Sequence, residues 1–211
     1  MNTGYEEFES IGDNCEFAFF LRDSDCDDGS MFRWTLIKNY DSFIGLLNKD
    51  FENIFEYKNL VPSWQDMVLD KSCDICFHTK MYSDNVDGEW QWRFSEKENR
   101  EIHKNELEKL DYLIDKFKKG VSSGKKTYVL KNNASNLDAQ AQEISKYLKK
   151  LGTSSLLYVK KADENNTPGK IVKLDNNFFI GFIDRFADYS RANEYSRSGW
   201  ELLLKNYNDI K

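Results

Sequence analysis

Cys15 is the residue whose setting in the sequence most directly suggests chemistry. It lies in GDNCEF, residues 12–17, between a short apolar segment and a run of aromatic residues. Asp13, with Glu16 three positions later, matches a variant of the capping box and predicts a helix that begins directly after Asp13. Cys15 would then occupy the second helical position, where free amides and the helix dipole stabilise a thiolate. The alternative is a small buried residue, the commonest environment of a free cysteine.

A base for such a thiol must be one of the two histidines, His78 and His103. His78 falls in a predicted strand, with Cys76 two residues earlier on the same face. His103 falls on the apolar stripe of a predicted helix, which favours a packing role at the edge of the core. A single histidine in a strand is also most often structural, so spacing alone does not select a catalytic pair.

Other motifs give weaker indications. Cys73-x-x-Cys76 lies in a predicted strand that would send the two thiols to opposite faces, so we expect no metal site. Gly-rich phosphate-binding motifs and the Gly-x-Ser-x-Gly motif of serine hydrolases are missing from the sequence, and no cofactor is predicted. Trp90 and Trp92, near Arg93, form either a sugar-stacking or partner surface or the core of an edge element.

Composition narrows the class of protein. The chain has 211 residues, a net charge of −6 and a pI of about 5.1, which argues against a nonspecific nucleic-acid binder. No apolar run approaches the roughly 18–20 residues of a membrane span. The acidic start lacks the basic and apolar regions of a signal peptide, so we expect a cytoplasmic protein with reduced cysteines.

The periodicity of apolar residues predicts alternating helices and strands. We expect helices over 14–22, 41–47, 99–119, 137–151 and 200–207, and strands over 8–12, 72–81, 126–131, 155–160, 171–174 and 178–183. The strand–helix–strand order across 126–160 predicts a parallel βαβ unit. The prediction is therefore a single α/β domain over 1–211, with three layers, a mostly parallel Rossmann-like or hydrolase-like sheet, and a meander of short strands near the C-terminus.

Several segments resemble a bacterial family of unknown function that is named for papain-like cysteine peptidases. SIGDNCEFAFFLR, followed by MFRW, is similar to the family's opening Ser-Leu-Gly-x-x-Cys pattern and its aromatic-x-Trp-like element. CDICFHTKM resembles a strand that carries a histidine, matched by His78, and SGWELLLKN resembles the closing helix, with its tryptophan at Trp200. Segments 152–174 and 178–189 resemble a subgroup found beside, or fused to, glycosyltransferases.

The resemblance implies a cysteine-dependent hydrolase or acyltransferase with a Cys15–His78 pair. The thiolate would attack an acyl carbon, and the imidazole would take the thiol proton and later give it to the leaving group. A third group would orient the imidazole, and Asp13 and Asn132 are the candidates.

The expected substrate is a small molecule, a peptide or a glycan. Candidate substrate-binding residues are Arg33, Trp34, Trp90, Trp92 and Trp200. The alternative function is a non-catalytic or glycan-related module in bacterial surface-polysaccharide biosynthesis, associated with a glycosyltransferase and using an open groove lined by Trp90, Trp92 or Trp200. A purely structural GDNC turn remains a third interpretation.

Overall fold

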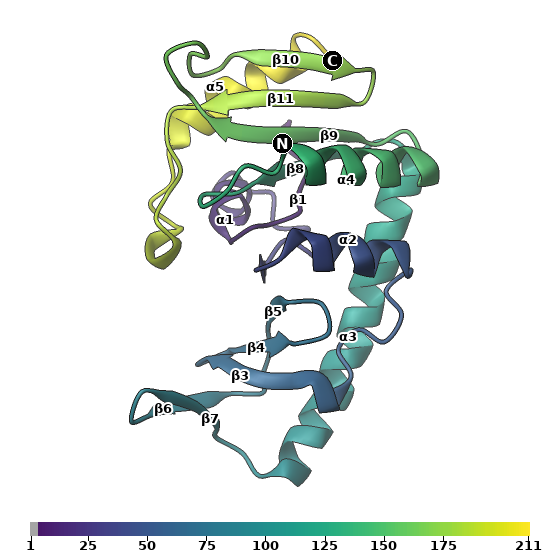
Figure 1. Ribbon diagram of the computed structural model, residues 1–211, viewed down its shortest axis with the longest axis vertical. Helices are drawn as coiled ribbons and strands as arrows, with labels where there is room; N and C mark the ends of the chain where they lie inside the picture. Colours follow the sequence, from purple (N-terminus) through teal and green to yellow (C-terminus); the bar gives the residue numbers. More distant parts are fainter. Residues whose placement is uncertain (1–3) are drawn as a thin grey trace.

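The computed structural model describes residues 4–211 and shows a mixed α/β protein. In this range, five α-helices accompany a mostly parallel five-stranded sheet, a four-stranded antiparallel sheet and a two-stranded hairpin. The five-stranded sheet lies at one end of the molecule and the antiparallel strands at the other, and the long helix α3 (Glu96–Ser123) runs along both (Figure 1). The sequence predicted one sheet, whereas the antiparallel strands form separate sheets beside the mostly parallel one.

The five-stranded sheet has the order β1-β8-β9-β11-β10. Its strands are β1 (Phe8–Ser10), β8 (Thr127–Lys131), β9 (Ser155–Lys161), β11 (Phe178–Ile183) and β10 (Ile171–Asp175). The first four are parallel and β10 is antiparallel at the edge. Helix α4 (Asp138–Leu151) connects β8 to β9, which confirms the predicted βαβ unit. The predicted C-terminal meander is the single hairpin β10–β11.

Both faces of this sheet are buried. Tyr128 and Leu130 belong to one apolar cluster, with residues of α3 and α4. Val129, between them, belongs to a second cluster with residues of α1 (Glu16–Arg22) and α5 (Arg197–Asn208). This alternation follows from the two-residue period of a strand, and it explains why β8 reads as an almost continuous apolar run.

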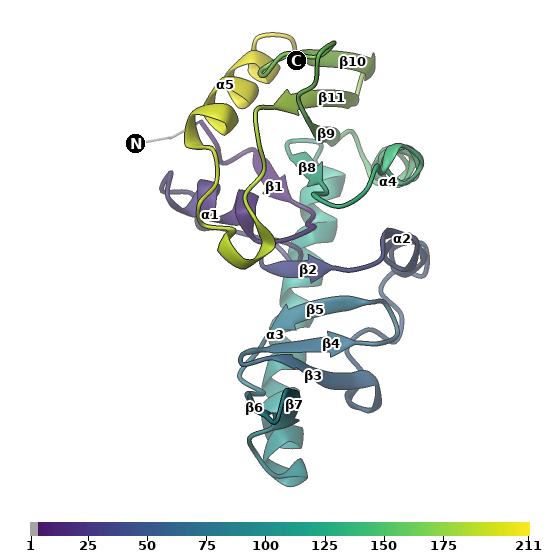
Figure 2. The same cartoon turned by 60° about the vertical axis from the view of Figure 1, so that its left-hand side comes forward.

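The antiparallel sheet has the order β2-β5-β4-β3. Its strands are β2 (Thr35–Ile37), β5 (Ile75–His78), β4 (Met67–Asp70) and β3 (Leu60–Trp64). Pro62 is tolerated in β3 because β3 is an edge strand, where a missing N–H breaks no central ladder. Helix α2 (Tyr40–Asn48) follows β2, and the hairpin of β6 (Ser83–Val86) and β7 (Glu89–Trp92) follows β5. Figure 2 shows β2 between α1 and the rest of this sheet.

The turn between β1 and α1 joins the two sheets. Ile11 N donates to Val129 O at 3.0 Å in the parallel sheet, and Ile37 N of β2 donates to Asp13 O at 2.9 Å. Gly12 has φ +81°, and a Cβ on it would lie 2.8 Å from Cδ1 of Ile37. A glycine is therefore needed here for both its backbone conformation and its close approach to β2.

We expect Gly12→Ala to lower the free energy of unfolding by about 1–3 kcal/mol, because it combines a left-handed conformation with a contact against Ile37. Urea denaturation measures this loss. Gly88→Ala is the matched control, since Gly88 has φ +92° but its Cβ would meet nothing within 4 Å. Equal losses in the two variants would contradict the role given to the contact with Ile37.

Candidate active site

A cavity of about 830 Å³ lies where α1, the antiparallel sheet and α3 meet. Cys15 and His78 both line it, which places the two residues of the predicted pair on one cavity. Cys15 directly precedes α1, and His78 is the last residue of β5. Two further walls come from the loop before β2, which includes Trp34, and from the segment around Tyr189.

His78 is oriented by Asp66, a residue that the sequence did not single out. Nδ1 of His78 lies 2.9 Å from Oδ2 of Asp66, and both side chains are partly exposed. Because a carboxylate only accepts, Nδ1 carries a proton, and in the neutral imidazole Nε2 is then the acceptor nitrogen. Asp66 immediately precedes Met67, which pairs with His78 across β4 and β5. Asp66 can therefore be identified only from the pairing of β4 with β5, which the sequence does not show.

The second histidine has a different role. Nε2 of His103 lies 2.7 Å from the carbonyl oxygen of Phe55, and the His103 ring stacks on the Phe55 ring. His103 does not line the cavity, and its contacts are those of the packed residue that the apolar stripe indicated.

Cys15 rests as a neutral thiol. Burial raises its pKa to about 11, the negative charges of Asp66 and Asp13 add to the rise, and Lys131 partly opposes it. The prediction that a helix start would stabilise a thiolate here is therefore wrong. Cys15 is itself the N-cap residue of α1, not its second residue. Within residues 4–211, no hydrogen bond joins Cys15 to His78.

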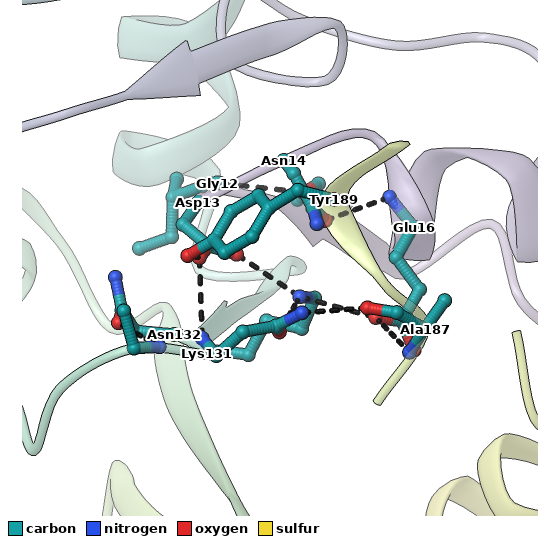
Figure 3. A network of polar contacts seen from close by, with 12 residues as sticks. Gly12, Asp13, Asn14, Glu16, Lys131, Asn132, Ala187 and Tyr189 are labelled. Atoms are coloured by element: carbon teal, nitrogen blue, oxygen red, sulfur yellow. Dashed lines mark hydrogen bonds and ion pairs between the residues drawn. The ribbon is translucent and has the colours of Figure 1, made fainter. Parts of the chain in front are cut away.

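Asp13 is not a helix cap, and the structure gives it a different partner (Figure 3). Oδ1 of Asp13 lies 3.0 Å from Nζ of Lys131, which lies 3.1 Å from Oε2 of Glu16. Tyr189 donates to Oδ2 of Asp13 at 2.5 Å. All three members of this ion cluster (Asp13, Glu16 and Lys131) are buried. Asp13 therefore holds the turn in place and does not orient His78.

Glu16 and Trp200 extend the ion cluster toward α5. Trp200 Nε1 donates to Oε1 of Glu16 at 3.2 Å, and the backbone N–H of Ala187 donates to Oε2 at 3.1 Å. Burial raises the pKa of Glu16. Trp200 is fully buried. The prediction that Trp200 contacts a ligand is therefore wrong for this structure, because its indole is part of the core.

Arg33 is also fully buried, so a direct contact with substrate is excluded in this structure. Its Nε pairs with Oε1 of Glu9 at 2.9 Å, and its Nη1 donates to the carbonyl of Cys26 at 2.6 Å. These contacts fix the loop that forms one cavity wall.

Trp34 does line the cavity. It meets the Phe19 ring edge to face at 5.3 Å, and the guanidinium of Arg22 lies 5.4 Å from the Trp34 ring centroid. Of the five predicted substrate-binding residues, Trp34 is the one whose position agrees with the cavity.

Trp90, Trp92 and Asn132 lie outside the cavity lining. Trp90 packs against Trp64 at 4.9 Å, and Trp64 is exposed and lines the cavity, so Trp90 supports its rim. Trp92 packs against the core. Oδ1 of Asn132 accepts the backbone N–H of Ala134 at 2.8 Å, which closes a local turn. Asp66, not Asn132, is therefore the group that orients His78.

Comparisons with known proteins assign this chain to no family. No protein-family model, curated protein or solved structure matches the chain. Across residues 4–211, no helix is long and apolar enough to cross a membrane, and no group of three or more acidic, histidine or cysteine side chains is arranged to hold a metal ion. The interpretation of this site therefore depends on the positions of Cys15, His78 and Asp66.

We expect Lys131→Met to lower the free energy of unfolding by about 3–5 kcal/mol at neutral pH, because it leaves two buried carboxylates without their cation. Burial already raises the pKa of Glu16, so the folded variant would bind a proton at Glu16 more readily than the unfolded chain. Its stability should therefore recover as the pH falls toward about 5 and be lost as the pH rises. Urea denaturation at several pH values measures both effects.

Lys146→Met is the control, since Lys146 forms an exposed pair with Glu143 at 2.7 Å. Its loss should be at most about 0.5 kcal/mol at any pH. A Lys131 variant as stable as the control would show that the ion cluster does not hold the turn.

Proposed function

We propose that this protein is a cysteine-dependent hydrolase or acyltransferase, with Cys15 as nucleophile, His78 as general base and Asp66 as the orienting carboxylate. One observation carries the proposal. Cys15 lines the same cavity as a histidine whose Nδ1 is bonded to a carboxylate, which leaves Nε2 as a proton acceptor. Nucleophile, base and orienting group are the three roles of a hydrolase triad.

The raised pKa of Cys15 determines when its thiol would lose the proton in such a reaction. Because the thiol is neutral at rest, its proton moves to Nε2 of His78 as Sγ forms a bond to the acyl carbon. The bond from that carbon to the leaving group then breaks, and the leaving group takes the proton from Nε2. The acyl group passes from Sγ to water or to another acceptor. Catalytic hydrogen bonds that are open in a ligand-free site commonly form when substrate binds.

The cavity supports a substrate with a sizeable apolar part. Its volume of about 830 Å³ is in the range of small-molecule sites, and Phe19, Trp34 and Trp64 supply aromatic walls. A peptide or a glycan conjugate with an acyl group fits this description. The turn and helix that follow β1 line the cavity together with strands of the antiparallel sheet, which supports treating the chain as one functional domain. Membership of the papain-like family and association with a glycosyltransferase remain part of this proposal.

A glycan-related module without catalysis is the second candidate. The observations that favour it are the aromatic walls and the raised pKa of Cys15, since a binding site needs no thiolate. In that case glycans or nucleotide sugars would raise the melting temperature, Trp34→Ala would abolish the shift, and Cys15→Ala would leave it unchanged.

Acylation by p-nitrophenyl acetate tests the catalytic proposal. We expect one acetyl group on Cys15 at neutral pH, detected by intact-protein mass and peptide mapping, and none in Cys15→Ala. His78→Ala should slow acylation by about 100-fold or more, since it removes the base. His103→Gln is the control and should react like the wild type, because His103 bonds to the Phe55 carbonyl away from the cavity. Acylation that is unchanged in His78→Ala would contradict the proposal.

Asp66→Asn should move two rates in opposite directions. The negative charge of Asp66 raises the pKa of Cys15, so its removal lowers that pKa from about 11 and increases alkylation by iodoacetamide at mildly alkaline pH. The same change weakens the hydrogen bond that orients the imidazole of His78, so acylation at neutral pH should fall by about tenfold or more. Both rates are measured on one protein preparation. A rise in both would show that Asp66 acts through its charge alone.

A further inference from the structure

Asn14 carries an unpaired amide group directly beside the nucleophile. Asn14 is 5 % exposed, and it lines the cavity together with Cys15. Oδ1 accepts the backbone N–H of Glu16 at 3.0 Å, whereas Nδ2 is buried without a hydrogen-bond partner among the described residues.

The orientation of this amide is fixed by its neighbour. An exchange of Oδ1 and Nδ2 would place an NH₂ group against the N–H of Glu16, so that two donors would face each other. The contact at 3.0 Å therefore determines which atom is the free one. The unpaired atom of Asn14 is a donor.

Such a donor is costly in a folded protein. A buried N–H without a partner keeps the full penalty of its lost hydration, and most buried polar groups are paired for this reason. Five buried side-chain atoms lack partners in residues 4–211, and two of them, Asn14 Nδ2 and Ser30 Oγ, belong to residues of the cavity lining. Asn14 is the one adjacent to Cys15. An acceptor that enters with the substrate would remove this cost.

We propose that Nδ2 of Asn14 donates to the carbonyl oxygen of an acyl substrate and to the oxyanion formed from it. This inference rests on the proposed function and narrows the substrate to an ester, thioester or amide. When Sγ of Cys15 bonds to the acyl carbon, the π electrons of the carbonyl move to its oxygen, which Asn14 stabilises. When the carbonyl re-forms, the bond to the leaving group breaks, and the leaving group takes the proton held by His78. Alkylation of the same thiol forms no oxyanion and gains nothing from Asn14.

The ratio of acylation to alkylation tests this assignment. Acylation of Cys15 by p-nitrophenyl acetate and its alkylation by iodoacetamide are measured at one mildly alkaline pH. Alkylation reports the reactivity of the thiol itself, so a change in the ratio separates an effect on the acyl oxygen from a change in the accessibility or general reactivity of Cys15. In Asn14→Asp, the side chain still accepts the Glu16 N–H but has no amide donor. We expect the ratio to fall by about 100-fold, the effect of losing one oxyanion donor. Asn14→Ala should give a similar fall.

Asn39→Asp is the matched control, because Oδ1 of Asn39 also accepts backbone N–H groups, at the start of α2, and its side chain is exposed. Its ratio should equal that of the wild type. A wild-type ratio in Asn14→Asp, with acylation still dependent on Cys15, would overturn the role of Asn14 and leave the proposed function standing. A wild type that is alkylated at Cys15 but never acylated would overturn both.

Discussion

The site depends on the ion pairs and hydrogen bonds made by the buried ammonium of Lys131. Its Nζ has three acceptors, namely Asp13 at 3.0 Å, Asn133 at 2.7 Å and Glu16 at 3.1 Å. Three N–H groups thus meet three acceptors, which is the condition under which a buried charge is tolerated. Donors from Tyr189, Asn133, Ala187 and Trp200 complete the two carboxylates. All of these partners come together in only one arrangement of β1, β8, α1 and the segment before α5. The ion cluster therefore fixes the positions of these elements more than it increases the free energy of unfolding.

The parallel sheet explains why these charges meet. Lys131 ends β8, Asp13 follows the neighbouring parallel strand β1, and the carboxyl ends of adjacent parallel strands share one edge of a sheet. From there the turn reaches the second sheet through the Ile37 N–H and the Asp13 carbonyl. Ile37 belongs to β2, which pairs with β5, and β5 ends at His78. Cys15 and His78, far apart in the sequence, are therefore related by a short series of backbone pairings.

The sequence predicted well the parts of the fold that depend on local patterns. The βαβ unit over 126–160 and the long amphipathic helix follow from apolar periodicity, and both are present. The capping pattern at Asp13 failed because a distant lysine competes for the same carboxylate, and tertiary ion pairing prevailed over local helix capping. A lysine at the end of the otherwise apolar strand TYVLK was a signal that a buried partner was needed.

The candidate site was less predictable for the same reason. Tryptophan and arginine are residue types common in binding sites. Here both are buried: Trp200 donates a hydrogen bond to the carboxylate of Glu16, and Arg33 pairs with the carboxylate of Glu9. Burial of such side chains cannot be read from residue type. Asp66 has no distinctive spacing in the sequence, because its relation to His78 arises from the pairing of β4 with β5.

The negative charge around Cys15 has an opposite effect on the two ends of the proposed proton transfer. Asp66 raises the pKa of Cys15 and so disfavours the thiolate at rest, yet the same carboxylate is bonded to His78 and stabilises an imidazolium. In the proposed reaction, charge separation is thus unfavourable in the ligand-free protein and would become favourable once the developing negative charge leaves sulfur for the carbonyl oxygen of a substrate. The proposed donor, Asn14 beside Cys15, would stabilise that oxygen and not the resting thiol. For the proposed function, the arrangement would therefore favour the transition state over the ground state, which is the requirement for catalysis.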